Sequence, residues 1–387
     1  GTHTQPDCNI FCNFAIECGP VFASIFISSG NSVLGAISAR PSILPKYLAR
    51  TGFSLFLYLR IVMRDFPILT FKPQFKSVIW GGKRIAEFKN MPPQGDKIGE
   101  SWELSGVPGH ESIVADGPYE GMNLQELINT HADEIMGTRL VGRFGHEFPL
   151  LIKLIDSADD LSVQVHPDDK IAHERHNCPG KTEMWVSIAP ADGAYLYSGL
   201  RHSLTPDEYR KAIAENTIIA DLGKYYPKKD DVFFLPAGRI HSIGRGNFVL
   251  EIQETSDITY RIYDYDRRDA AGNPRQLHVE ESVAAVNFND TADAAPTHIP
   301  EGKDTEFVIA DCDHFTTTAL YVDGTYTIDL SKRDSFTIVT VTEGSASLIA
   351  PGGVVTELTQ GQTALIPASM AAVTVKGNGR IISAYIK

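Results

Sequence analysis

The chain has 387 residues, of which 43% are hydrophobic and 21% charged, a composition that excludes a disordered or fibrous protein. With 35 Lys and Arg against 48 Asp and Glu, its net charge is -13, a sign that disfavours binding to nucleic acid or to an anionic membrane. The five cysteines form no paired motif, so we expect no disulfide scaffold and a reducing, cytoplasmic setting.

Residues 1–62 differ from the rest of the chain, because no helical or strand period is evident in them. Residues 53–62 form an apolar run, but Arg60 interrupts it, and it is much shorter than the ~20 residues of a membrane span. We therefore expect Met63 to begin the functional protein. Residues 1–62 are interpreted as a dispensable extension outside the functional fold.

Two helices are predicted beyond an extended segment at 71–80. Residues 123–139 place apolar side chains mostly three and four apart, after the favourable N-cap Asn123. Residues 205–222 carry Pro206 in the first turn, followed by two acidic residues that suit the positive end of a helix. Both segments therefore favour helices inserted among strands.

Short apolar strands with Gly and Pro between them dominate the remaining sequence. They are predicted at 150–155, 162–165, 183–188, 231–235 and 248–253. Such a pattern is typical of a β-barrel or sandwich. From about residue 305 the chain is almost wholly strand-like, with turns predicted at 323–324, 351–353 and 377–379.

These patterns predict two domains after the extension. Residues 63–300 form a catalytic metal-binding domain with helical insertions, and residues 301–387 form a smaller β-domain without metal ligands. The sequence DVFFLPAGRIH at 231–241 has an echo in QTALIPASMAA at 362–372, where alanine stands in place of the final histidine. If both domains are barrels of one kind, only the first keeps a metal ligand at this position.

Side chains that commonly ligate metals occur at strand positions of the first domain. Gln164 and His166 lie two apart, so both point to the same face of a strand. Glu183 begins the next strand after a predicted helical turn, and His241 begins another strand. Two imidazoles, a carboxylate and an amide oxygen can hold a divalent ion and leave positions for substrate. Each residue also has a structural interpretation as a buried hydrogen-bonded group, and the spacing alone does not decide.

The histidines in polar helical or loop contexts are interpreted as solvated residues. These are His173, His176, His202 and His278.

Six short motifs follow one another between residues 71 and 268. They are WGG at 80–82, GESWELS at 99–105, QVHP at 164–167, KTEMW at 181–185, LPAGRIHSIG at 235–244 and SDITYRIYDYDR at 256–267. Together they resemble the motifs of class I mannose-6-phosphate isomerases, in the short bacterial form, within the cupin superfamily. The resemblance implies a mainly β fold: a cupin (jelly-roll) β-barrel with helical insertions and a second, smaller C-terminal cupin-like β-domain.

The resemblance also implies an activity and residue roles. It implies a zinc-dependent aldose–ketose isomerase that interconverts mannose 6-phosphate and fructose 6-phosphate by proton transfer through an enediol. One Zn²⁺ per chain would be held by Gln164, His166, Glu183 and His241. Arg261 would be essential for catalysis. Longer members carry an aromatic residue where this chain has Ile243, so no role for a tyrosine is transferred.

The chemistry requires a base and a contact for the phosphate close to the metal. The candidates for catalytic groups are Lys181, Glu251 and Arg261, and those for substrate binding are Asp257 and Arg267. Glu251 lies in the otherwise apolar strand FVLEIQE, where an inward carboxyl group would have a raised pKa. An outward, solvated Glu251 is the alternative. Lys181, Glu251 and a zinc-bound water all remain candidates for the base.

Other functions remain open at this point. One is a cupin isomerase of another sugar phosphate or of a free sugar, and another is a non-catalytic, sugar-sensing cupin. A metal-binding storage or structural β-protein would not require Lys181, Glu251 and Arg261. The expected partner is a small-molecule sugar phosphate, with neither nucleic acid nor membrane, and the sequence leaves the oligomeric state open.

Overall fold

The computed structural model describes residues 12–19, 22–29, 32–39, 66–268, 272–291 and 294–387. The chain divides into two compact units, residues 1–65 and 66–387. In the first unit one antiparallel sheet has the order β1 (Cys12–Gly19), β2 (Phe22–Ser29) and β3 (Ser32–Ala39). The sequence analysis did not predict these three strands, because Ser and Gly interrupt their apolar alternation. The apolar run at 53–62 and Met63 lie outside the described residues.

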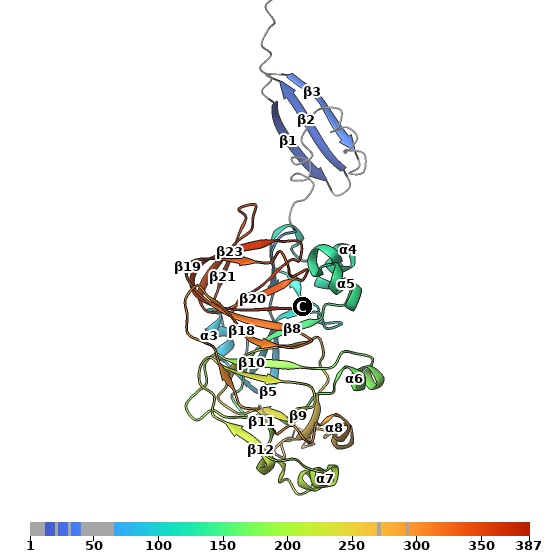
Figure 1. Cartoon of the computed structure of the whole chain (residues 1–387), viewed down its shortest axis with the longest axis vertical. Coiled ribbons are helices and arrows are strands. Elements are labelled where there is room, and N and C mark those ends of the chain that lie inside the picture. Colours follow the sequence, from blue (N-terminus) through green and yellow to red (C-terminus); the bar gives the residue numbers. More distant parts are fainter. Residues whose placement is uncertain (1–11, 20–21, 30–31, 40–65, 269–271, 292–293) are drawn as a thin grey trace, which may run out of the picture. The chain divides into compact units, whose positions relative to one another are not determined.

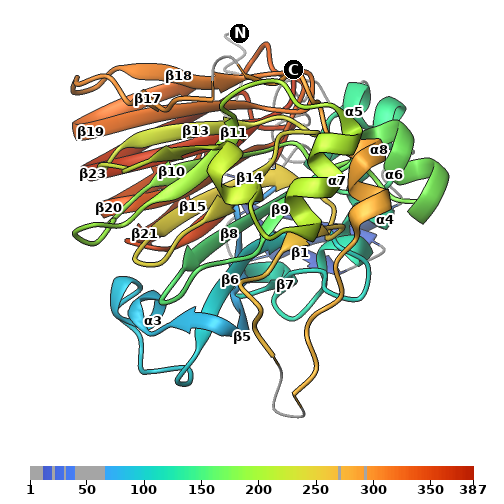
Figure 2. The same ribbon diagram turned by 90° about the horizontal axis from the view of Figure 1, so that it is seen from below.

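The second unit is built from three sheets (Figures 1 and 2). The seven-stranded sheet has the order β17 (Thr297–His298), β13 (Asp231–Leu235), β10 (Glu183–Ser187), β15 (Phe248–Glu254), β8 (Leu150–Asp156), β6 (Ile98–Ser105) and β5 (Gln74–Gly82). The five-stranded sheet has the order β12 (Leu222–Tyr225), β11 (Leu196–Leu200), β14 (His241–Ile243), β9 (Val163–Val165) and β16 (Tyr260–Tyr263). The prediction of a mainly β fold is confirmed.

The eight-stranded sheet contains most of the C-terminal chain. Its order is β18 (Glu306–Asp311), β19 (Thr316–Asp329), β23 (Ala372–Tyr385), β20 (Thr337–Ile349), β22 (Thr363–Ile366), β4 (Leu69–Lys72) and β7 (Ile113–Val114), with β21 (Val355–Thr359) paired to β20. Strands β4 and β7 come from the N-terminal side of the unit, and Thr70 of β4 pairs with Ala364 of β22. The C-terminal sheet is therefore completed by residues that precede β8, β10 and β15 in the chain.

The seven-stranded sheet is the middle layer of this unit. In β8, Leu150, Ile152 and Leu154 share a core with residues of the eight-stranded sheet. The alternate residue Ile155 packs instead in a core with Leu196 and Ile243 of the five-stranded sheet. Burying one such aliphatic side chain contributes about 1.5–3 kcal/mol to folding. Both faces of β8, β10 and β15 are consequently buried, and polar residues on their odd-numbered positions point into the space between the seven- and five-stranded sheets.

Most helices lie along one side of the strands in both views (Figures 1 and 2). They are α4 (Leu124–Met136), α5 (Thr138–Phe144), α6 (Asp169–His176), α7 (Pro206–Ala214) and α8 (Val279–Ala285), while α3 (Arg84–Phe88) lies apart from them. The predicted helix at 123–139 is confirmed to Met136, with a capping box at Asn123. The helix predicted at 205–222 ends at Ala214, because Asn216 adopts a φ of 57° and a short 3₁₀ helix follows.

Two of the three turns predicted near the C-terminus are wrong. β19 and β23 run through 323–324 and 377–379 without reversing, and Gly324 pairs with Gly377 across the ladder. Gly377 and Gly379 allow close contact between strands, since a Cβ on Gly377 would lie 2.3 Å from the Ser345 carbonyl oxygen and one on Gly379 would lie 2.2 Å from the Glu343 carbonyl oxygen. The turn at 351–353 is confirmed.

The sequence echo has a structural counterpart. In the first copy β13 leads through Pro236 to β14, which begins at His241. In the second copy β22 leads through Pro367 to β23, which begins at Ala372. Both segments are therefore a strand, a proline-containing connection and a second strand.

No helix within the described parts of the chain is long and apolar enough to cross a membrane.

Candidate active site and metal centre

The four predicted metal ligands lie between the seven- and five-stranded sheets. Glu183 is the first residue of β10, and His241 is the first residue of β14. His241 pairs in the ladder with Gln164 of β9, and His166 follows at the end of that strand. Residues on or next to three strands in two sheets thus come together. Gln164 and His166 contribute to the same group, as their two-residue spacing predicts.

A buried carboxylate lies at the centre of this group. Glu183 Oε2 is 3.4 Å from His166 Nε2, and Glu183 Oε1 is 3.3 Å from His241 Nε2. Glu183 is 0% exposed and both histidines are 1% exposed. The Gln164 amide nitrogen lies 3.3 Å from His241 Nε2. Rotating this amide by 180° would turn its oxygen toward the same point.

The backbone fixes which nitrogen of each histidine faces the carboxylate. Nδ1 of His166 donates to the Ile258 carbonyl oxygen at 2.9 Å, and Nδ1 of His241 donates to the Arg239 carbonyl oxygen at 2.9 Å. Since a carbonyl oxygen only accepts, each Nδ1 carries its proton and a neutral ring keeps its Nε2 lone pair free. This is the arrangement in which proteins present histidine to a metal.

Electrostatics keep these groups in the protonation states that a metal requires. Burial, with the nearby Lys181 charge, lowers the pKa of His166 to about 3, and burial also lowers the pKa of His241. Burial opposes ionisation of Glu183, but Lys181 and the two histidines outweigh it and hold the pKa of Glu183 well below its usual range. Neutral imidazoles and an ionised carboxylate result.

The same group has unsatisfied hydrogen-bonding atoms. His166 Nε2 and Glu183 Oε1 are buried without a hydrogen-bond partner, while Glu183 Oε2 is paired with the Lys181 ammonium group at 3.1 Å. Leaving such atoms unpaired is costly in a protein interior. The ligating atoms of His166, Glu183 and His241 all lie within 4.8 Å of one another. The donor set therefore fits a divalent metal ion.

Lys181 and Glu251 approach this centre from the seven-stranded sheet. Lys181 Nζ is 3.1 Å from Glu183 Oε2, and its side chain is buried. Glu251 pairs with Trp185 across the ladder and accepts a hydrogen bond from the Trp185 indole at 3.0 Å. Burial raises the pKa of Glu251, with Lys153 acting in the opposite direction. Glu251 therefore points inward, and the outward alternative is wrong.

Lys153 is a buried cation that the sequence interpretation missed. It pairs with Glu251 in the ladder between β8 and β15, and its Nζ lies 3.2 Å from Glu251 Oε2. Burial would lower the pKa of Lys153, but Glu100 and Glu251 outweigh that effect and raise it. The signal was present in LLIKLID at 150–156, where one lysine interrupts an apolar strand as Glu251 does in its own strand.

Three arginines gather at the end of β16. Arg261 pairs with Gln164 across the ladder, and its Nε is buried without a hydrogen-bond partner. Arg267 and Arg275 both bond the carboxylate of Asp264, Arg275 through Nε at 2.6 Å. Burial and the positive charges of Arg275 and Arg267 lower the pKa of Arg261, and the negative charge of Asp264 does not outweigh them. Sequence reasoning named Arg261 and Arg267 but missed Arg275.

Other predicted residues lie further from the metal ligands. Asp257 is exposed, and its charge contributes to the raised pKa of Lys153. Among the histidines interpreted as solvated, His278 is an exception, because its Nδ1 accepts the backbone N–H of Arg261 at 3.1 Å. His176 is exposed, but it hydrogen-bonds the Tyr260 hydroxyl at 2.8 Å. Both histidines thus contact β16, which carries Arg261.

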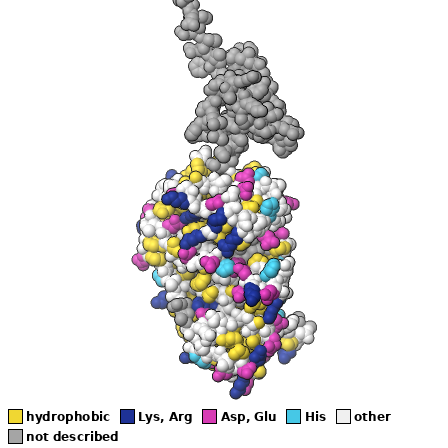
Figure 3. Space-filling model, turned by 45° about the vertical axis from the view of Figure 1, so that its right-hand side comes forward, with side chains coloured by type: hydrophobic (Ala, Val, Ile, Leu, Met, Phe, Trp, Pro, Cys, Tyr) yellow, Lys and Arg dark blue, Asp and Glu magenta, His cyan; other side chains and the backbone are white. Residues whose placement is uncertain are grey.

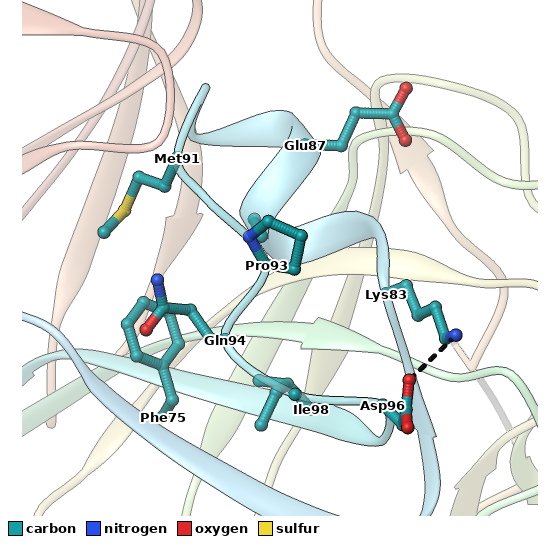
Figure 4. Close-up of a pocket in the computed structure, with 10 residues that line it drawn as sticks. Phe75, Lys83, Glu87, Met91, Pro93, Gln94, Asp96 and Ile98 are labelled. Carbon is teal, nitrogen blue, oxygen red and sulfur yellow. Dashed lines mark ion pairs between the residues drawn. The ribbon is translucent and has the colours of Figure 1, made fainter.

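A cavity of about 550 Å³ lies away from this centre, near α3 (Figure 4). Phe75, Met91 and Ile98 line it, and an ion pair of 3.0 Å joins Lys83 to Asp96 at its edge. None of the predicted site residues lines it. On the face in Figure 3, basic and acidic side chains are mixed.

Two segments of the chain match known protein families. A family model described as phosphomannose isomerase type I, catalytic domain, matches residues 68–193. A second, described as mannose-6-phosphate isomerase, cupin domain, matches residues 303–386. The chain is 32% identical over 321 residues to mannose-6-phosphate isomerase ManA of Bacillus subtilis, covering 82% of this chain and 98% of that protein. It is 32% identical over 318 residues to mannose-6-phosphate isomerase of Streptococcus mutans, with coverages of 82% and 98%.

Solved structures agree with the sequence comparisons. The crystal structure of the mannose 6-phosphate isomerase from Bacillus subtilis matches with a TM-score of 0.73 and 32% identity, over 82% of this chain and 99% of that chain. A putative mannosephosphate isomerase from Archaeoglobus fulgidus matches with a TM-score of 0.69 and 25% identity, over 84% and 99%. The similarity therefore extends over nearly the full length of these proteins.

Proposed function

Because the chain belongs to the type I phosphomannose isomerase family, we propose that it interconverts mannose 6-phosphate and fructose 6-phosphate at the centre around Glu183. The observation that carries the proposal is the orientation of His166 and His241. Both rings donate Nδ1–H to a backbone carbonyl and present Nε2 to a buried carboxylate whose Oε1 lacks a hydrogen-bond partner. A site of this kind serves a metal-assisted reaction.

We propose zinc as the metal, held by Gln164, His166, Glu183 and His241. Nitrogen ligands together with a carboxylate suit Zn²⁺, whereas Mg²⁺ prefers oxygen ligands and several waters. When bound, the ion would supply Lewis-acid stabilisation for the oxyanion that develops next to the carbon losing its proton. The protein supplies the remaining groups.

Proton transfer is assigned to Glu251 and Lys181. In the forward direction a base takes the proton from C2 of mannose 6-phosphate while the C1 carbonyl oxygen gains one. The enediol is then protonated at C1 as the O2 hydroxyl loses its proton, which leaves fructose 6-phosphate. Glu251 is the proposed base, because burial raises its pKa toward the range useful for a general base. Lys181, 3.1 Å from Glu183, is proposed to move the proton on the substrate oxygens, and it remains the alternative base.

The phosphate is proposed to bind at the three arginines, and Asp257 is proposed to contact the sugar. Arg267 and Arg275 share one carboxylate, Asp264, and they lie close enough to lower the pKa of Arg261. A guanidinium group matches a phosphate with two parallel hydrogen bonds. An anion carrying about two charges would relieve the repulsion among these side chains.

Replacing Arg267 with alanine should raise the KM for mannose 6-phosphate. Losing one charge-assisted hydrogen bond costs about 1.5–3 kcal/mol, which corresponds to a KM raised roughly 10- to 150-fold. Initial-rate kinetics measure this, and inorganic phosphate should weaken as a competitive inhibitor by a similar factor. Arg210→Ala, which removes an exposed pair with Glu280, is the control and should leave both values unchanged. An unchanged KM in Arg267→Ala would remove Arg267 from the phosphate site.

The reaction and the metal are tested together by chelation. Purified protein should form fructose 6-phosphate from mannose 6-phosphate, lose this activity after chelation and regain it when Zn²⁺ is added. Mg²⁺ and Mn²⁺ added in parallel test the choice of metal. A folded, zinc-loaded protein that does not turn over mannose 6-phosphate contradicts the proposal, and other sugar phosphates and free sugars would then be assayed.

A further inference from the structure

The segment that carries Lys181 is held by side chains from elsewhere in the fold. Gly180 N–H donates to Asp169 Oδ1 at 2.8 Å, and Thr182 N–H donates to Glu254 Oε2 at 2.7 Å. Between them, Lys181 N–H donates to the Pro167 carbonyl oxygen at 3.1 Å. Three successive N–H groups are thus fixed immediately before Glu183, where β10 begins.

This arrangement depends on close packing. A Cβ on Gly180 would lie 2.5 Å from the backbone nitrogen of Asp169, so a side chain there would push the segment away from α6. Thr182 also accepts a backbone bond at its carbonyl oxygen from Glu254 N–H at 3.2 Å. Glu254 therefore contacts both polar groups of the Thr182 backbone, and any movement of its side chain would act on the residue between Lys181 and Glu183.

Glu254 is itself held by His314, which lies in the connection between strands β18 and β19 of the C-terminal sheet. Its Nδ1 is 2.8 Å from Glu254 Oε1 and 3.9 Å from Asp169 Oδ2. Glu254 is 7% exposed, whereas the His314 side chain is 25% exposed. A continuous chain of hydrogen bonds runs from His314 through Glu254 to Thr182.

Electrostatics strengthen the first of these bonds. The hydrogen bond to Glu254 raises the pKa of His314, with burial acting against it and the charges of Glu254 and Asp169 adding to it. Arg143 lies on the other side and lowers this pKa. Hydrogen bonds between charged partners are about twice as strong as neutral ones.

Asp169, Glu254 and His314 are close enough to hold a cation between them. However, the polar atoms of these side chains already have hydrogen-bond partners. His314 Nδ1 and Glu254 Oε1 bond each other, Glu254 Oε2 takes the Thr182 N–H, and Asp169 Oδ1 takes the Gly180 N–H. A bound ion would have to break the bonds that hold residues 180–182, so we interpret the group as a hydrogen-bonded support.

We propose that His314 is a positioning residue: through Glu254 it fixes Thr182, and thereby orients Lys181 and Glu183 at the metal centre. The C-terminal sheet, which the sequence predicts to lack metal ligands, would contribute to catalysis by this route. The part of this inference that is tested by turnover rests on the proposed isomerase function. The part that is tested by zinc affinity does not depend on that activity.

The test compares His314→Ala with two variants in the full-length protein. His314→Asn keeps a donor, because the Asn amide nitrogen occupies nearly the position of Nδ1. His298→Ala removes a pair of similar length, 2.9 Å from Asp231, that touches none of residues 180–183. Zinc affinity is measured by competition with a chelator, kcat and KM with mannose 6-phosphate at saturating zinc, and folding by thermal denaturation.

For His314→Ala we expect zinc affinity and kcat each to fall roughly tenfold, as for other residues that support a metal ligand, while KM stays close to the original value. His314→Asn should restore most of both losses, and His298→Ala should show neither. If His314→Ala matches His298→Ala in zinc affinity and kcat, or if His314→Asn restores nothing, the proposal is overturned. An original protein that binds zinc but lacks isomerase activity would refute the proposed function, and the ratio of zinc affinities would still decide the role of His314.

Discussion

His241→Ala should abolish both zinc binding and isomerase activity. His241 faces Glu183 through Nε2 at 3.3 Å and is 1% exposed, so no other side chain or bulk water readily takes its place. Losing the metal would remove several kcal/mol of transition-state stabilisation, a decrease in kcat/KM on the order of 10³-fold or more. Metal content after gel filtration, measured beside initial rates, checks both effects.

Arg261→Ala is the matched comparison. Arg261 pairs with Gln164 in the ladder through its backbone, which the substitution keeps, while the guanidinium group is lost. We expect one zinc per chain in this variant with nearly all turnover gone. Zinc retained by an active His241→Ala protein would exclude His241 as a ligand, and full turnover in Arg261→Ala would exclude Arg261 from the chemistry.

Glu251→Gln should lower kcat by about 10²–10⁴-fold, the usual contribution of a general base, with zinc still bound. An ionised base is needed, so the activity of the unsubstituted enzyme should fall as the pH drops through the pKa of Glu251. Because burial raises this pKa, the decline should begin at higher pH than for an exposed glutamate. The Gln variant should lack this acidic limb, which a pH–rate profile would reveal.

The same substitution also affects stability, and this requires a control. Lys153 would keep only Glu100, at 3.9 Å, and an unpaired buried charge costs about 3–5 kcal/mol. Combining Glu251→Gln with Lys153→Met should restore the melting temperature but not turnover. A Glu251→Gln enzyme that is folded, zinc-loaded and within tenfold of the original kcat would contradict the assignment, and Lys181 would become the proposed base.

Local patterns predicted the strands around the site because each is a short run rich in apolar residues. The strand predicted at 231–235 agrees with β13, and the one predicted at 150–155 falls one residue short of β8. Prediction failed where a glycine can serve either in a turn or inside a strand. Gly324 and Gly377 look like turn residues in the sequence, but in the structure they face each other inside a ladder. Only the pairing of strands some fifty residues apart decides between these uses.

The candidate site could be predicted to the extent that its residues share short motifs. Gln164, His166 and Glu183 lie in runs of a few residues, and the six motifs correctly indicated the isomerase family. Lys153 and Arg275 were missed, because their importance comes from partners on other strands or across a loop. His314 was missed for the same reason, since Glu254 is sixty residues earlier in the chain.

The middle position of the seven-stranded sheet has a consequence for local motion. Glu183, Glu251 and Lys153 lie on β10, β15 and β8, which are covered on both faces and hydrogen-bonded on both edges. Such strands cannot fray separately, and their amide protons exchange with solvent only when the whole unit opens. Glu183, Glu251 and Lys153 are therefore held as rigidly as the unit itself, whereas Arg261 lies on β16 at the edge of the five-stranded sheet, with Arg267 and Arg275 in the segment that follows it. At the proposed site, adaptation to a substrate would therefore fall to the arginines.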